Sequence, residues 1–275
     1  LTIPENFGRK LVRGERPALL LEADATDPAA TSNALAALVQ LTQTALQRDL
    51  AGSLAHLNGS PPAFAVSIHR RYNPEGVTQY NIVPGLIGVV LTMTMIMMTS
   101  LAMTRERERG TMENLLATPV RPIEVMAGKI VPYIIVGYVQ VIILRLVAKL
   151  LFAVPIVGSL LLLSVALVVF IAANLAVGFT FSTLAKSQMQ AMQMTFFFFL
   201  PSMLLSGFMF PFRGMPEWAQ WVGGFLPLTH FLRVVRGVLL KGAPMSSIAP
   251  ELGAILLFFF AVALLTLLRF RRTLD

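Results

Sequence analysis

Residues 158–184 read GSLLLLSVALVVFIAANLAVGFTFSTL, a run without a charged side chain. An α-helix rises about 1.5 Å per residue, so a segment of this length crosses the roughly 30 Å hydrocarbon core of a bilayer. A helix satisfies its own backbone hydrogen bonds there, which lipid cannot do. The stretch therefore predicts a membrane-spanning helix, and the fold follows from how often the pattern recurs.

Four other apolar segments of spanning length lie in the chain, and none carries Asp or Glu. The composition agrees, because 56% of the residues are hydrophobic, 13% are charged and the mean hydropathy is +0.72. A soluble domain carries roughly 25% charged residues, so a water-solvated globule is excluded. We predict an α-helical polytopic membrane protein with five spans, at 82–104, 130–152, 158–184, 190–211 and 252–268.

The net charge of +8 at pH 7 lies in the apolar part of the chain, since residues 1–80 are balanced. No run of basic residues is interleaved with aromatic side chains, so no nucleic-acid partner is expected. The basic residues instead fit positions that flank membrane-spanning helices. The sequence has no cysteine, which excludes disulfides, thiolate metal ligands and cysteine nucleophiles.

Residues 1–80 predict a small α+β domain ahead of the transmembrane domain, 81–275. Residues 17–26 and 63–69 alternate apolar and polar side chains, as half-buried strands do. Between them, apolar residues recur at helical spacing over 29–54. Asp27 and Pro28 are typical of a helix start.

The basic residues predict which side of the membrane each connection faces. If the spans alternate, the loop 105–129, the link 185–189 and the C-terminal tail share one side. By the positive-inside rule that side is cytoplasmic, which leaves 1–80 and 212–250 outside. The basic residues on the cytoplasmic side are Arg105, Arg107, Arg109, Arg121, Lys129, Lys186, Arg269, Arg271 and Arg272.

An exterior domain ahead of an inward-running span needs a way across the membrane. The simplest is an earlier transmembrane helix upstream of Leu1, so six spans are expected in the full protein.

Basic residues in the segment 212–250 weigh against placing that segment outside, although long loops count less in the positive-inside rule. They are Arg213, Arg233, Arg236 and Lys241.

The loop 105–129 predicts a short amphipathic helix. Gly110 permits a bend, Thr111 can cap a helix, and Pro119 ends it. Its apolar face would consist of Met112, Leu115 and Leu116. Such an element either anchors the loop at the interface or receives a push from a cytoplasmic partner, and periodicity alone leaves both open.

Several separated motifs resemble type-2 ATP-binding-cassette (ABC) permeases, in particular the bacterial multidrug-export subgroup. The loop carries Glu108-Arg-Gly-Thr-Met-Glu113, Leu115-Leu-Ala-Thr-Pro119 and Gly128-Lys129. Residues 4–15, PENFGRKLVRGE, are similar to the start of the family's large exterior loop. Residues 227–237, PLTHFLRVVRG, are similar to the element before its last span. The resemblance covers the whole chain and lacks only the family's first span.

The resemblance implies a permease of a bacterial inner membrane that pairs with a second permease copy and with cytoplasmic nucleotide-binding ATPase subunits. The sequence has no G-x-x-x-x-G-K-S/T phosphate loop, so ATP chemistry belongs to another chain. No cofactor is expected on this chain, with ATP and magnesium on the partner subunit. The ATPase-coupling residues implied are Glu108, Arg109, Gly110, Thr111, Glu113, Leu115, Leu116 and Pro119.

The implied activity is export of a drug-like or amphipathic substrate. The family moves drugs, lipids, polysaccharides and other cargo, and a shared fold does not select among them. The resemblance also leaves homodimer and heterodimer open.

The segment 212–250 is too apolar for an ordinary loop and too interrupted for a span, which predicts two half-helices dipping from the outer face. Trp218 and Trp221 share a helix face and suit the membrane interface. The segment either anchors at the interface or, as the resemblance implies, gates the exit path. The gate residues would be Trp218, Trp221, Pro227, His230, Arg233 and Arg236.

His230 has no Asp, Glu or His partner at ligand spacing, so no metal site is expected. A hydrogen-bonded structural role is favoured over a substrate contact.

Arg145 and Lys149 lie one helical turn apart near the outer edge of a span, where long side chains snorkel to water. An outer vestibule for anionic substrates or lipid headgroups is the alternative.

Some polar residues within the spans are candidates for hydrogen bonds between helices. They are Gln140, Asn174, Gln190 and Gln193.

Two other classes of function compete with the exporter. A membrane-embedded enzyme needs a catalytic constellation, and the predicted spans offer no acid, no cysteine and no histidine pair, so no catalytic residue is assigned. A membrane scaffold or receptor would use residues 1–80 to bind a ligand. Copurification separates these classes, because only the exporter requires a stoichiometric ATPase.

Overall fold

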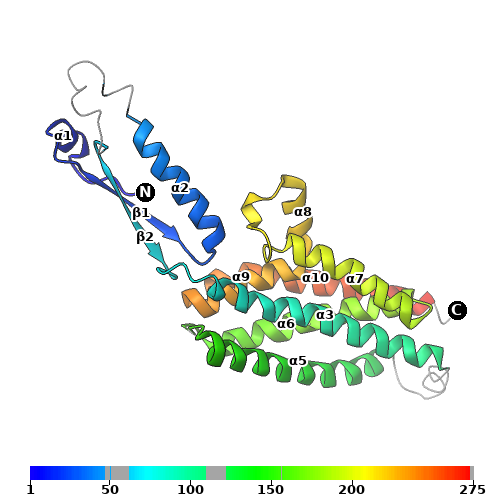
Figure 1. Ribbon diagram of the computed structural model, residues 1–275. Helices are drawn as coiled ribbons and strands as arrows, with labels where there is room; N and C mark the ends of the chain where they lie inside the picture. Colours follow the sequence, from blue (N-terminus) through cyan, green and yellow to red (C-terminus); the bar gives the residue numbers. More distant parts are fainter. Residues whose placement is uncertain (47–49, 51–61, 110–121, 156, 273–275) are drawn as a thin grey trace. The chain divides into compact units, whose positions relative to one another are not determined.

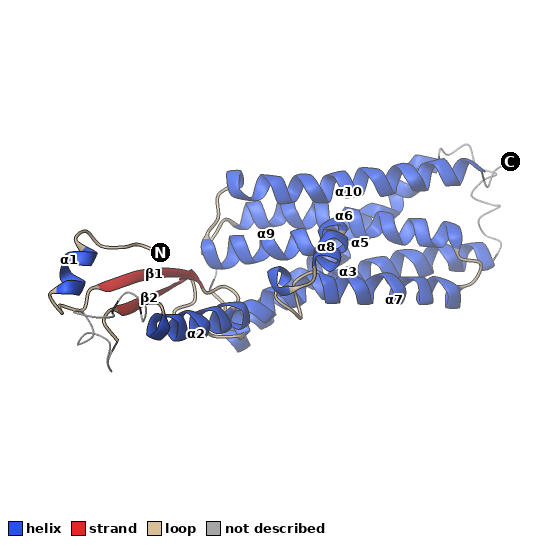
Figure 2. Ribbon diagram, turned by 90° about the horizontal axis from the view of Figure 1, so that it is seen from above, coloured by secondary structure: helices blue, strands red, loops and turns tan. Residues whose placement is uncertain are grey.

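A computed structural model describes the chain except for residues 47–49, 51–61, 110–121, 156 and 273–275. It folds as two compact units, Leu1–Asn81 and Ile82–Asp275. Figure 2 shows that, in the described part, strands belong to the first unit and the second is built of helices.

The first unit is a two-stranded parallel sheet with helical connections. Strand β1 (Ala18–Asp24) pairs with β2 (Ala65–Arg71) in the register Ala18 opposite Ala65. Parallel strands need a crossover connection, which contains helix α2 (Pro28–Thr44). A short helix, α1 (Phe7–Val12), precedes β1.

Both predicted strands and the predicted helix are present, and Asp27 acts as the expected cap. Its carboxylate accepts a hydrogen bond from the Ala30 backbone N–H at 3.3 Å. The helix ends at Thr44, ten residues before the predicted end at 54. Residues 47–49 and 51–54 of the predicted helix lie outside the described residues.

The second unit consists of long helices that run alongside one another (Figure 1). They are α3 (Gln79–Glu108, which begins at the end of the first unit), α5 (Pro122–Phe152), α6 (Leu160–Leu184), α7 (Gln188–Leu205) and α10 (Met245–Arg272). Between α7 and α10 lie three shorter helices, η2 (Phe212–Gly214), α8 (Glu217–Phe225) and α9 (Pro227–Lys241).

Four helices among the described residues are long and apolar enough to cross a membrane, over Gln79–Glu106, Val131–Phe152, Leu160–Leu184 and Met245–Leu267. They correspond to four of the five predicted spans. The remaining one, 190–211, falls on α7, which ends at Leu205 before a turn at Gly207 with φ of +84°. Helices α8 and α9 meet at 84°, so 217–241 is no single straight span.

Helix α6 lies at the centre of the unit and contacts α5, α7, α9 and α10. Phe170 of α6 stacks on Phe231 of α9, with ring centroids 3.9 Å apart and planes 6° from parallel. By contrast, only 17% of the spanning window is buried in α5 and in α10. These two helices therefore present apolar faces to their surroundings.

Polar side chains join the helices within this apolar core. Thr94 Oγ1 donates to Gln140 Oε1 at 2.9 Å, which confirms the bond between helices predicted for Gln140. Asn174 does not fulfil that role, because its Nδ2 donates to the Phe170 carbonyl of its own helix. Further pairs between helices are Ser100 with Thr195 at 3.2 Å and Thr180 with Thr266 at 2.7 Å.

Candidate functional site

The end of α3 is tied to the start of α7 by one carboxylate. Glu108 is the last residue of α3, and Gln188 is the first of α7. Glu108 Oε1 accepts a hydrogen bond from the Gln188 backbone N–H at 2.8 Å, and Oε2 accepts one from the Gln188 side-chain amide. A carboxylate at this position satisfies a free N–H at the helix N-terminus and complements the helix dipole.

These hydrogen bonds also fix the charge state of Glu108. The side-chain amide of Gln188, followed by its backbone N–H, lowers the pKa of Glu108 below the usual carboxyl range. Because hydrogen bonds to the charged form favour it, Glu108 is ionised at neutral pH and the contact is complete there.

Residues of the 185–189 link build the N-terminus of α7 locally. Ser187 Oγ accepts from the Gln190 N–H at 3.3 Å and serves as the N-cap. Gln190 Oε1 accepts from the Lys186 N–H at 2.7 Å, so it supports the link rather than a bond between helices. Together these bonds hold the amide of Gln188 facing Glu108.

Glu108 and Arg109 are the predicted coupling residues that the structure describes, and both side chains are exposed. The other predicted coupling residues fall within 110–121 and lie outside the described residues, so the amphipathic helix there stays a prediction. They are Gly110, Thr111, Glu113, Leu115, Leu116 and Pro119. Gln188 was missed because local patterns do not pair residues that are 80 positions apart.

At the other end of the unit, His230 and Arg233 of α9 meet Glu251 of α10. His230 Nδ1 bonds Glu251 Oε2, and His230 Nε2 lies 2.8 Å from the Gly224 carbonyl oxygen. Both partners carry oxygens that can accept a hydrogen bond from a ring N–H. Arg233 Nη1 donates to the Glu251 carboxylate at 3.3 Å, and its guanidinium lies 4.8 Å from the Phe212 ring centroid.

The sequence analysis found no acidic partner for His230 at ligand spacing and did not identify Glu251, which lies 21 residues further along the chain; His230 is hydrogen-bonded, as expected. The last span was expected to start at 252, whereas α10 starts at Met245 and includes Glu251. The signal was present, since Glu251 is the one acidic residue in the sequence of that helix. Helices extend beyond their apolar runs, and the polar first turn is where such a residue is found.

The other predicted gate residues lie in different surroundings. Trp218 and Trp221 of α8 are 65% and 73% exposed, so they share an outward face as expected. Pro227 is buried at the first turn of α9. Arg236 Nη1 donates to the Gly207 carbonyl at 3.2 Å. The six residues therefore do not form one cluster.

Known proteins resemble this chain over its length. Residues 1–268 match the profile of the family described as "ABC-2 family transporter protein". The chain is 29% identical over 269 residues to "Probable multidrug ABC transporter permease YbhR" of Escherichia coli, covering 98% of this chain and 72% of that protein. It is 31% identical over 287 residues to "Inner membrane transport permease YhhJ" of the same organism, covering 100% and 73%.

A third relative, "Probable multidrug ABC transporter permease YbhS" of Escherichia coli, is 33% identical over 225 residues, which cover 79% of this chain and 59% of that protein. The resemblance drawn from the loop and end motifs is thereby confirmed. With its apolar helices and its match over residues 1–268, this multi-pass membrane protein belongs to the ABC-2 family of transporter permeases.

Proposed function

We propose that the chain is the permease subunit of an ATP-driven exporter whose ATP is hydrolysed by a separate nucleotide-binding subunit. Family membership supports this, and the Glu108–Gln188 contact carries the argument from the structure. The segment 110–121 follows directly on that contact and precedes α5, which begins at Pro122. A partner that displaces this segment acts on α3, α5 and α7 together.

ATP hydrolysis is coupled to transport if the nucleotide-binding subunit binds one conformation of the permease more tightly than another. A nucleotide-binding subunit that contacts the 110–121 segment more favourably in one arrangement of the helices shifts the population toward it. The ionised Glu108 transmits the displacement to α7, because moving α3 alone would break two hydrogen bonds.

The end of the unit that holds Glu108 faces the cytoplasm in this proposal. Arg105, Arg109 and Lys186 gather there as exposed cations, the distribution typical of cytoplasmic connections. Residues 1–80 then lie outside the membrane. The relatives named multidrug permeases support a drug-like or amphipathic cargo. The apolar faces of α5 and α10 provide surface for lipid and for a second permease copy.

Copurification followed by reconstitution tests the function. A tagged full-length permease should retain a stoichiometric ATPase, and vesicles holding the complex should move a fluorescent drug-like dye only with ATP and magnesium. Joint Glu108→Ala and Glu113→Ala replacement should abolish transport while insertion stays intact, with Glu106→Gln as the control on the same helix. A permease that purifies without an ATPase would instead favour the scaffold or receptor.

Sidedness has its own test. The sequence has no cysteine, so one introduced thiol reports its own location. Lys186→Cys should resist an impermeant maleimide in intact cells and react after permeabilisation. Glu75→Cys in the first unit should react in intact cells. The reverse pattern would refute the orientation.

A further inference from the structure

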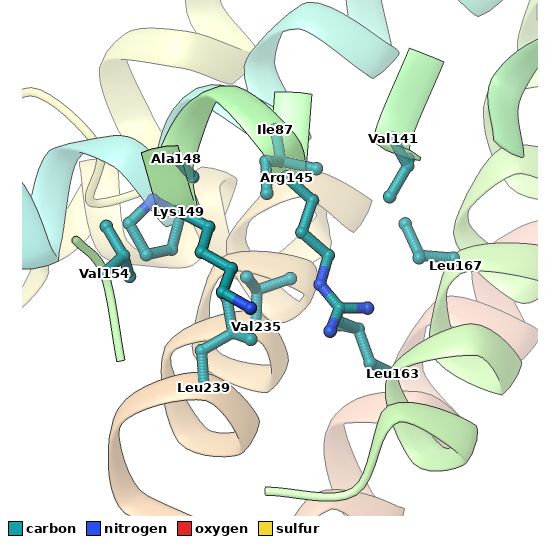
Figure 3. Close-up of a pocket in the computed structure, with 11 residues that line it drawn as sticks. Ile87, Val141, Arg145, Ala148, Lys149, Val154, Leu163, Leu167, Val235 and Leu239 are labelled. Atoms are coloured by element: carbon teal, nitrogen blue, oxygen red, sulfur yellow. The ribbon is translucent and has the colours of Figure 1, made fainter. Parts of the chain in front are cut away.

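Arg145 and Lys149 of α5 point into a small apolar space between four helices (Figure 3). The Arg145 guanidinium points toward Leu163 of α6 and the Lys149 ammonium toward Val235 of α9 (Figure 3). Leu239 of α9, Val154 and residues of α3 also line the space, and the cavity has a volume of about 20 Å³. Two cations one helical turn apart therefore face a pocket without acidic lining in the described residues.

Among the residues that the structure describes, neither cation has a protein partner that would account for its position. Across the described ranges, Arg145 and Lys149 take part in no hydrogen bond or ion pair, whereas Arg233 on α9 pairs with Glu251. Arg145 is half-buried and Lys149 is exposed. Two like charges on one helix face repel each other, and the apolar side chains around the half-buried Arg145 cannot solvate its guanidinium. An anion at the mouth of the pocket would relieve both costs.

The adjoining surface of α5 indicates what kind of anion. Ile135, Val139 and Ile142 are 59%, 50% and 55% exposed, and they recur at helical spacing on the side of Arg145 toward the middle of the span. An amphiphile whose headgroup contacts the two cations would lay its acyl chain along this stripe. The cavity holds about one water-sized group, so the chain would lie outside it.

We propose that Arg145 and Lys149 form a binding site for a phosphate-bearing anion, with the apolar stripe favouring the headgroup of an anionic phospholipid. The guanidinium fork matches two phosphate oxygens, and the ammonium acts as a second point charge. The site lies at the opposite end of α5 from the segment that follows Glu108. It needs neither ATP nor transport, so its test is independent of the exporter proposal.

Lipid binding to the purified full-length permease tests the site. Native mass spectrometry would compare the affinity for phosphatidylglycerol with that for phosphatidylcholine. Arg145→Gln with Lys149→Gln should weaken phosphatidylglycerol binding by at least about tenfold and leave phosphatidylcholine unchanged. Lys149→Gln alone, at an exposed position, should give part of the loss without disturbing the fold. Lys186→Gln with Arg213→Gln removes the same charge elsewhere and should retain the selectivity.

Inorganic phosphate separates the two sources of the anion. If millimolar phosphate leaves the selective phosphatidylglycerol binding in place, the ligand is the lipid headgroup. If phosphate itself binds the protein and displaces the lipid, and if the double variant shows neither the binding nor the displacement, the site takes the free anion. Equal phosphatidylglycerol selectivity in the wild type and in the double variant would overturn the proposal.

Discussion

Gly178 of α6 lies against the backbone of Ile96 in α3. A Cβ placed on Gly178 would stand 2.8 Å from the Ile96 carbonyl oxygen and 2.8 Å from Thr99 Cβ. The two helices thus approach as closely as a residue without a side chain allows, which is how helices in membranes gain packing contacts.

Replacing this glycine should separate the two helices. Gly178→Ala forces a backbone shift, and we expect a loss of stability of about 1–3 kcal/mol, as for other overpacked cores. Gly253→Ala in α10 is the matched control, because no described atom beyond its chain neighbours and its own helix backbone lies within 4 Å of the added Cβ. Removing that helical glycine should be neutral or stabilising by up to about 1 kcal/mol. Thermal unfolding in detergent measures both, and a Gly178→Ala protein as stable as the control would contradict the packing.

The charge of Glu108 should matter for stability in a pH-dependent way. Its pKa is lowered in the folded protein by the two hydrogen bonds from Gln188. The contact therefore contributes stability above the unfolded carboxyl pKa of about 4.3 and loses it as the pH falls through the lower folded value. The unfolding midpoint of the wild type should exceed that of Glu108→Gln by a constant number of degrees between pH 6 and 8. This difference in midpoint, the margin, should vanish in acid. A margin that grows on acidification would show that the carboxylate is not the bonded form.

Glu251 should be required to hold α9 against α10. Glu251→Ala leaves His230 and Arg233 without their carboxylate, and hydrogen bonds to charged groups are worth about 1.5–3 kcal/mol. We expect a lower unfolding midpoint, with Glu217→Ala at an exposed acid of α8 as the control. Equal midpoints for the two variants would mean that the cluster adds no stability.

The two tryptophans should report on the membrane interface. Trp218 and Trp221 are the only tryptophans in the sequence, and both lie on the exposed face of α8. In a chain carrying only these two, lipids spin-labelled near the headgroup should quench the fluorescence more strongly than lipids labelled near the chain end. Stronger quenching from the chain end would place α8 inside the hydrocarbon core.

Hydropathy predicted the helical architecture because the lipid that surrounds the spans requires helices. In lipid, a spanning segment must be apolar and must close its own backbone hydrogen bonds, so runs such as 158–184 have one solution. Where a helix begins is less constrained, because its polar first turn lies beyond the apolar run. Thus α10 begins seven residues before the predicted span, and Glu251 was left out of the site.

Partners far apart in the chain were not predictable in the same way. Glu108 and Gln188 meet because α3 and α7 pack with their ends level, a property of the assembled unit rather than of either segment. Asn174 shows the converse. The carbonyl four residues earlier is always within reach of a helical side chain, and this local bond replaced the expected bond to a neighbouring helix.

The 84° corner between α8 and α9 joins an exposed helix to a deeply buried one. Helix α9 is embedded along most of its length, and tilting it would expose Phe231 and Leu232 and unstack the ring of Phe170. Helix α8 buries only Ala219 and Gly223 among its own residues. On either side of Leu226, the non-helical residue at the corner, the Gly223 carbonyl accepts from Thr229 Oγ1 and the Gly224 carbonyl lies 2.8 Å from His230 Nε2, so the exposed helix is fastened to the buried one through two backbone oxygens.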